Sequence, residues 1–215
     1  MAAADDDDAR GASQLPPGLW DRLRLDPVRA PEHIALAAGR TFGPQAERWA
    51  ADKRARFAVT PAELGQMAKK RHATLARFEG AATGVGGFIT VVPDLAAMAW
   101  IQARMVFFIA AAHGYDPNDP MRPAELLVLY HFYPDPQSAR RALDGIGDTM
   151  VQAYVGSKLE RDEALALRLA KLLGIRSARR LAGRMIPGFA IAWNAVGNER
   201  RTRALADEAI RYYGG

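Results

Sequence analysis

Hydrophobic and polar residues follow one another along this chain with the period of an α-helix, and the alternation typical of a β-strand is almost absent. The strongest helix start is Thr60-Pro61-Ala62-Glu63. Threonine caps a helix, proline suits its first position, and Glu63 can return a bond to the cap. The segment 88–92 is rich in β-branched residues, but a lone strand has no partner, so we expect it to be helical. The sequence predicts an all-α protein folded as a multi-helix bundle.

Proline and glycine mark the other helix boundaries. Further helices are predicted at Trp20–Leu25, Pro31–Gly39, Gly43–Phe57, Arg122–Phe132 and Pro187–Tyr212. One apolar face is expected from Leu64, Met67, Ala68, Leu75 and Phe78, and another from Leu165, Leu169, Leu172 and Leu173.

Three regions follow from this pattern. Residues 1–15 form an expected disordered acidic tail, residues 16–42 a helical extension, and residues 43–215 the main helical domain. A chain of 215 residues can bury one substantial core, so a second full domain is not expected. The N-terminus carries an acidic run where a secretory signal needs basic residues and an apolar core, which predicts a cytoplasmic protein.

A glycine-rich apolar block spans Gly80–Tyr115 and is the most unusual stretch of the chain. Gly80 and Gly84 lie four residues apart, as do Thr83 and Gly87, so on a helix they would form a smooth strip that admits a second backbone. Each glycine costs about 1 kcal/mol relative to alanine inside a helix, which such close packing must offset. Two interpretations remain open: a close helix crossing in a soluble core, or a hairpin that contacts a membrane.

Pro93-Asp94 is predicted to bend this block into a central glycine-rich apolar helical hairpin. Asp94 would then interact with the positive end of the second helix, or else act as a functional buried acid. Leu95–Ala112 is long enough to cross a bilayer, but Arg104 lies at its middle and costs roughly 2.5–3.5 kcal/mol in lipid. A buried or interfacial helix that ends at Gly114 is therefore expected.

The chain carries a net charge of +5, and its remainder is more basic still once the run Asp5–Asp8 is set aside. Basic residues flank the apolar block and the second apolar stretch, residues 185–198. They are Lys69, Lys70 and Arg71, then Arg179, Arg180 and Arg184, then Arg200, Arg201 and Arg203. Such clusters either hold anionic lipid, at about 1 kcal/mol per residue, or form solvated helix faces. Nucleic-acid binding is not expected, because no recognised motif accompanies the charge.

Residues for catalysis or metal binding are sparse. The absence of cysteine excludes disulfides, thiolate zinc sites and cysteine nucleophiles. The four histidines are scattered, and the glycines lack the pattern and the lysine of a phosphate loop. We therefore expect a non-enzymatic protein with no catalytic residues, no metal and no cofactor. Asn194 and Asn198 share one helix face, where they would bond another helix or contact a ligand.

Several short motifs together resemble the EcsC protein family over roughly Gly43 to Tyr213. They are Gly80-x-x-x-Gly84-x-Gly86-Gly87, Pro93-Asp94, Ala110-Ala111-Ala112-His113-Gly114-Tyr115, Ile186-Pro187-Gly188 leading to Asn194, and the Ala209–Tyr212 ending. The resemblance implies an α-helical bacterial protein, with some members encoded beside an ABC transporter, and no catalytic residues. By position, Asp94, Gly114, Pro187 and Asn194 match the recurring pattern.

The leading hypothesis is a peripheral protein at the cytoplasmic membrane face that binds lipid or assists a membrane transport complex. The alternative is a soluble helical module that binds a small apolar ligand in its core, with Arg104, Asn194 or Asn198 as polar anchors. Vesicle binding separates the two hypotheses.

Overall fold

The computed structural model describes residues 14–82, 88–148, 158–175 and 195–215. Within those residues the chain forms eight α-helices, one short 3-10 helix and no strand, which confirms the all-α prediction. The elements are α2 (Leu19–Leu25), η1 (Pro27–Arg29), α3 (Ala30–Arg56), α4 (Pro61–Ala82), α5 (Phe88–Ala112), α6 (Arg122–Leu129), α7 (Pro136–Asp148), α8 (Lys158–Leu172) and α11 (Ala195–Gly214). Most of the predicted acidic tail, residues 1–13, lies outside the described residues.

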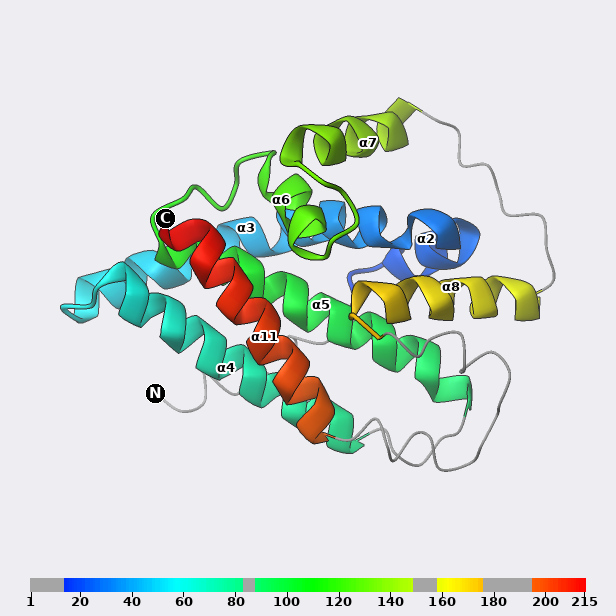
Figure 1. Ribbon diagram of the computed structural model, residues 1–215, viewed down its shortest axis with the longest axis horizontal. Coiled ribbons are helices and arrows are strands. Elements are labelled where there is room, and N and C mark those ends of the chain that lie inside the picture. The colour runs from blue at the N-terminus through cyan, green and yellow to red at the C-terminus, as the bar shows by residue number, and fades with distance from the viewer. Residues whose placement is uncertain (1–13, 83–87, 149–157, 176–194) are drawn as a thin grey trace.

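Helix α5 is the centre of the bundle, and α3, α4, α8 and α11 pack around it (Figure 1). Every side chain from Met98 to Ala112 is buried, because apolar residues occupy all faces of this helix and neighbours cover each of them. The apolar block of the sequence is therefore the core of the bundle over this range.

The predicted bend at Pro93-Asp94 is wrong, because α5 continues through Pro93. Pro93 is exposed and lies in the second turn of the helix, where its missing N–H removes one hydrogen bond close to the helix start. Asp94 is half-buried beyond the first turn, so it does not lie at the helix N-terminus, where the dipole acts most strongly.

The predicted glycine strip is described only in part. Gly80 belongs to the last turn of α4, whereas Gly84 and Gly87 lie outside the described residues. Helices α4 and α5 do pack side by side, but the connection between them falls within residues 83–87.

The predicted helix break between Gly39 and Pro44 is also wrong, because α3 is one continuous helix. The two glycines of this stretch serve packing. A Cβ atom on Gly39 would lie 2.8 Å from Cγ of Pro123, and one on Gly43 would lie 2.9 Å from the carbonyl oxygen of Pro117. Gly39 thus admits the start of α6, and Gly43 admits the segment that leads into it, to a close approach with α3. Helix α3 also crosses the boundary proposed at residues 42 and 43, and that domain division stays a prediction.

The strongest start and stop signals are confirmed. The Thr60 backbone N–H donates to Oε2 of Glu63 at 2.8 Å, and the Glu63 N–H donates to Oγ1 of Thr60 at 3.3 Å. This reciprocal capping box begins α4. Gly114 adopts a φ of 88°, and its N–H and that of Tyr115 both donate to carbonyls in the last turn of α5. This left-handed glycine cap ends the helix as the sequence predicts.

The predicted apolar faces are mostly confirmed. All four leucines of the α8 stripe, Leu165, Leu169, Leu172 and Leu173, are buried. On α4, Leu64 and Ala68 are buried, but Met67 is 38% exposed. Helix α11 ends close to the predicted position, while Pro187 and Asn194 lie outside the described residues.

Candidate functional site

Arg104 is the most deeply buried charged side chain that the sequence singled out. It is 1% exposed, and its Cζ atom lies 5.1 Å from the ring centroid of Phe108 and 5.9 Å from that of Phe42. The guanidinium therefore faces aromatic rings inside the bundle, where the ring quadrupoles stabilise it. Its position is a core position of the folded protein.

His72 of α4 lies beside this arginine, a neighbour that local sequence pattern did not predict. Its Nδ1 is 2.8 Å from the Ala68 carbonyl oxygen, and its ring contacts Phe108 edge-on at 5.1 Å. Burial lowers the pKa of His72 to about 3; the hydrogen bond to Ala68 opposes this shift, and the positive charges of Arg104 and Arg71 add to it. The ring is therefore neutral at physiological pH, with Nδ1–H donating to the carbonyl.

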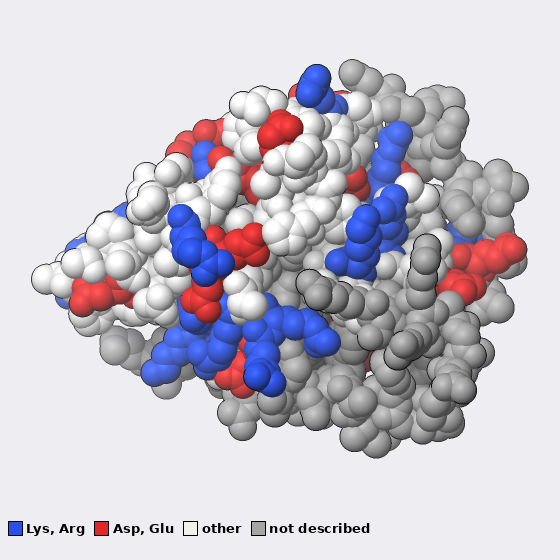
Figure 2. Space-filling model, viewed as in Figure 1, with Lys and Arg blue, Asp and Glu red and all other residues white. Residues whose placement is uncertain are grey.

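Two of the predicted basic clusters come together on neighbouring helices. Lys69 of α4 forms an ion pair with Asp207 of α11, and the two helices pack along most of their length. Figure 2 shows lysine and arginine side chains gathered on the face where α4 and α11 lie. We refer to Lys69, Lys70, Arg71, Arg200, Arg201 and Arg203 as the α4–α11 basic surface.

Exposure differs within the α4–α11 basic surface. Lys70, Arg200 and Arg203 are exposed, whereas Lys69, Arg71 and Arg201 are half-buried. Arg203 also pairs with Glu199 at 2.8 Å, one turn before it on α11. Lys70 and Arg200 are therefore the best probes of this surface. The third predicted cluster, Arg179, Arg180 and Arg184, lies outside the described residues.

A buried polar cluster that the sequence did not reveal joins α11 to α6. The Tyr213 hydroxyl donates to Oε2 of Glu125 at 2.8 Å, and Arg122 forms an ion pair with the same carboxylate. Burial raises the pKa of Glu125, while the bonds from Tyr213 and Arg122 oppose that rise. An arginine and a glutamate three residues apart are common on helices, so the sequence does not mark this pair as unusual. Only the packing of Tyr213 against Glu125 distinguishes it from an ordinary surface ion pair.

The remaining predicted positions are described only in part. Gly114 is a helix cap, Asp94 lies near the opposite end of α5, and Asn198 belongs to the first turn of α11, with its side chain outside the described part. An open surface depression between α2 and α8 is lined largely by charged residues: Asp21, Arg24, Leu25, Arg161 and Asp162. Such a lining does not suit a small apolar ligand.

In the part of the chain that the structure describes, one helix, Val92–Ala112, has the length and composition to cross a membrane, and 94% of its most apolar 18-residue stretch is buried inside the bundle. Among the described residues, no group of three or more histidine, aspartate and glutamate side chains is arranged to hold a metal ion.

Comparison with known proteins supports the resemblance seen in the sequence. The model of the EcsC protein family matches residues 38–214, which is most of the chain. A search of curated proteins and a search of solved structures each find no match. The chain belongs to the EcsC protein family.

Proposed function

We propose that this protein is a non-enzymatic peripheral protein of the cytoplasmic membrane face, where it binds anionic lipid headgroups and can meet a membrane transport complex. One observation carries the proposal. Basic residues from two helices far apart in the sequence gather on a single face, the α4–α11 basic surface (Figure 2). The negative surface potential of an anionic bilayer attracts a basic surface of this kind.

The burial of α5 favours surface attachment over insertion of that helix. Its apolar residues already contact α3, α4, α8 and α11, so exposing them to lipid would require the bundle to open. Charge attraction needs no such change, since each lysine or arginine near an anionic surface contributes about 1 kcal/mol. Exposed Lys70, Arg200 and Arg203 can make this contribution without unfolding.

Vesicle flotation tests the proposal. Wild-type protein is expected to float with vesicles of phosphatidylglycerol and phosphatidylcholine, and to stay at the bottom with phosphatidylcholine alone. The double variant Lys70→Glu/Arg200→Glu should bind the anionic vesicles at least about thirtyfold more weakly, because two attractive charges of about 1 kcal/mol each are lost.

The matched control is Arg40→Glu/Arg48→Glu, which reverses two exposed charges on α3 and changes the net charge equally. This control should retain most of the binding. Equal losses in both double variants would show that net charge alone governs the attachment, and absence of wild-type binding to anionic vesicles would overturn the proposed function.

A further inference from the structure

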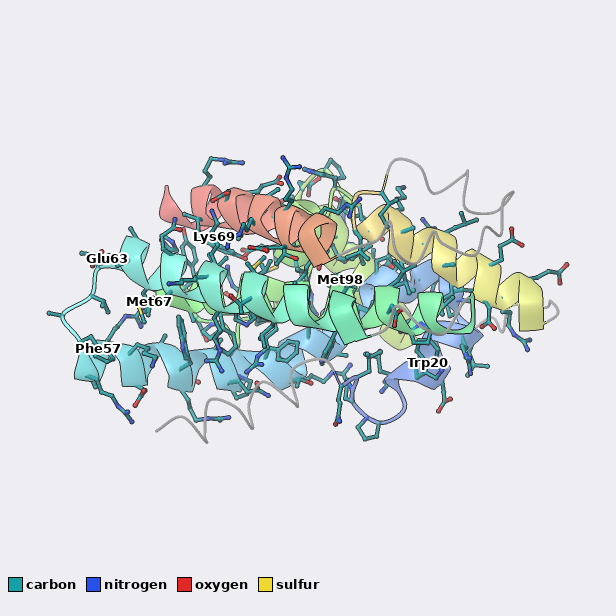
Figure 3. The ribbon with its side chains drawn as sticks, turned by 90° about the horizontal axis from the view of Figure 1, so that it is seen from below. Trp20, Phe57, Glu63, Met67, Lys69 and Met98 are labelled. Atoms are coloured by element: carbon teal, nitrogen blue, oxygen red, sulfur yellow. The ribbon has the colours of Figure 1, made fainter. Side chains whose placement is uncertain are left out.

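The α4–α11 basic surface carries more positive charge than the described acidic side chains on the same face neutralise. Figure 3 shows Lys69 on the side of α4 where α11 lies. The surface has six basic residues, and α11 adds three carboxylates: Glu199, Asp207 and Glu208. With all three ionised, an excess of three positive charges remains. Lys70 and Arg200 are exposed and form no ion pair with any described residue, so they are open to an anionic partner.

The chain itself contains a segment of matching charge. Residues 1–13, which lie outside the described residues, include the four consecutive aspartates Asp5–Asp8, and we call these four residues the acidic segment. Arg10 is the one basic side chain among residues 1–13, so their side chains carry a net charge of −3. This value balances the excess on the α4–α11 basic surface, and such complementarity favours one binding partner over others.

The connection to the bundle is long enough for this contact. The described chain begins at Gln14, and Leu15 already packs against the core. Asp8 precedes Gln14 by six residues and Asp5 by nine, so their extended reach is about 20 Å and about 30 Å. Helix α2 packs on α3, α3 on α5, and α5 on α4 and α11, with about 8–10 Å between neighbouring axes. The acidic segment can therefore cross the width of the bundle, from the side of Trp20 to the side of α11 (Figure 3).

The basic residues of α2 lie closer to the acidic segment in sequence, but acidic residues balance them. Helix α2 contains Arg22 and Arg24 together with Asp21, and Asp26 follows it directly. The Nε atom of Arg24 also lies 3.6 Å from a carboxylate oxygen of Asp162 on α8. Helix α2 thus offers no excess of positive charge, and the α4–α11 basic surface is the better electrostatic match.

We propose that the acidic segment binds the α4–α11 basic surface of its own chain when no membrane is present, and that anionic lipid displaces it. This inference rests on the proposed function and adds a regulation of the same surface. The short connection gives the segment an effective concentration in the millimolar range, although each exposed charge pair is weak. A bilayer rich in anionic headgroups therefore outcompetes four carboxylates, whereas a weakly charged bilayer does not. The acidic segment restricts attachment to strongly anionic membranes.

A pair of nitroxide labels tests the contact without lipid, since the chain contains no cysteine. Ala4→Cys labels the chain beside the acidic segment, and Thr74→Cys labels an exposed position of α4 one turn beyond Lys70. Electron paramagnetic resonance should show a population at short distance, which is lost when all four aspartates are replaced by asparagine or when Lys70→Glu/Arg200→Glu is introduced. The control pair joins Ala4→Cys to Gln137→Cys, exposed on α7, and should give the same distances in all three proteins.

Flotation measures the effect on lipid binding. With vesicles that contain little phosphatidylglycerol, Asp5→Asn/Asp6→Asn/Asp7→Asn/Asp8→Asn should bind about fivefold to tenfold more tightly than the wild type, the value expected when several weak charge pairs no longer compete. A control variant removes four exposed carboxylates from α2, α3, α7 and α8 and changes the net charge equally: Asp21→Asn, Glu47→Gln, Asp144→Asn and Glu163→Gln. Its binding should stay within about twofold of the wild type.

The outcomes separate the two proposals. If the label pair reports the contact but the wild type does not float with anionic vesicles, the proposed function fails and the contact within the chain stands. If the wild type floats but the distances from Ala4→Cys to Thr74→Cys are the same with and without the aspartates, this inference alone is overturned. A short distance between two singly labelled chains would place the acidic segment on a second copy, and would also overturn it.

Discussion

Two basic residues at the centre of the bundle, Arg104 and His72, are both removed from water, and their neighbours decide whether each is charged. Arg104 keeps its charge among the rings of Phe42 and Phe108, whereas burial forces His72 to be neutral. The Nε2 atom of His72 makes no hydrogen bond to any described residue. Protonation of this ring would therefore place a second positive charge beside Arg104 without new bonds to stabilise it.

His72 is expected to make the protein sensitive to acid. Its pKa falls from 6.5 to about 3 on folding, so the unfolded chain binds the proton more tightly. The stability from this residue is present at neutral pH and is lost as the pH falls from about 6.5 towards 3, at about 1.4 kcal/mol per unit. Between pH 7 and pH 4.5, His72 should lower the free energy of unfolding by roughly 2–3 kcal/mol.

Urea unfolding of the wild type and of His72→Leu at these two pH values measures this effect. The variant should lose roughly 2–3 kcal/mol less than the wild type over the same range, because leucine does not titrate. The carboxylates and the other histidines affect the stability of both proteins alike. The difference between the two pH-dependent losses of stability therefore measures the contribution of His72. Identical losses in the two proteins would show that His72 takes up its proton in the folded protein as readily as in the unfolded chain.

At the scale of elements, glycines inside helices α3 and α7 differ in what they pack against. Glycine and proline inside the helix look like a break in the sequence, yet Gly39 and Gly43 admit the segment that leads into α6. Gly145 of α7 has no comparable neighbour, since an added Cβ atom would meet nothing within 4 Å. These positions therefore predict opposite effects for the same substitution.

Gly43→Ala should destabilise the protein by about 1–3 kcal/mol, because the methyl group would overlap the Pro117 carbonyl oxygen and displace the segment before α6. Gly145→Ala should stabilise it by about 0.5–1 kcal/mol through helix propensity alone. Thermal and urea unfolding of both variants checks the signs. Stabilisation by Gly43→Ala would show that α3 and this segment do not approach as closely as the structure places them.

At the scale of the whole molecule, the C-terminal helix closes the bundle by binding elements from three parts of the chain. Helix α11 packs on α4 and α5, and Tyr213 ties its end to α6 through Glu125. The α4–α11 basic surface depends on this closure, because α11 contributes Arg200, Arg201 and Arg203 to it. A loss of α11 docking would therefore disturb the proposed lipid contact.

The neighbouring tyrosines of α11 provide a matched test of this closure. Tyr213→Phe should lower the free energy of unfolding by about 1–3 kcal/mol, since the buried Glu125 carboxylate loses a donor. Tyr212→Phe should change it by less than about 0.5 kcal/mol, because Tyr212 is 39% exposed. Urea unfolding measures both. Equal effects would indicate that water replaces the Tyr213 hydroxyl at no cost.

The sequence predicted local features well and contacts between distant segments poorly. The capping box at Thr60 and the glycine cap at Gly114 were predictable because all their bonds lie within a few residues. The break at Gly43 and the bend at Pro93 were predicted wrongly, because glycine and proline in a helix have the same local cost whether or not packing offsets it. The contacts of His72 with Phe108 and of Tyr213 with Glu125 were missed because these partners lie far apart in the sequence.

By itself, the sequence determined the helical class, the family and the positions of the basic clusters, since periodicity, short motifs and charge are local properties of the chain. Only the tertiary structure decided that the apolar block is a buried core, that α3 is one helix, and that Lys70 and Arg200 belong to the same surface. It also placed the end of α3 against the end of α5, where Arg54 caps the last turn. The physical reason is that burial and shared surfaces depend on which distant segments pack together, and local pattern leaves that choice open.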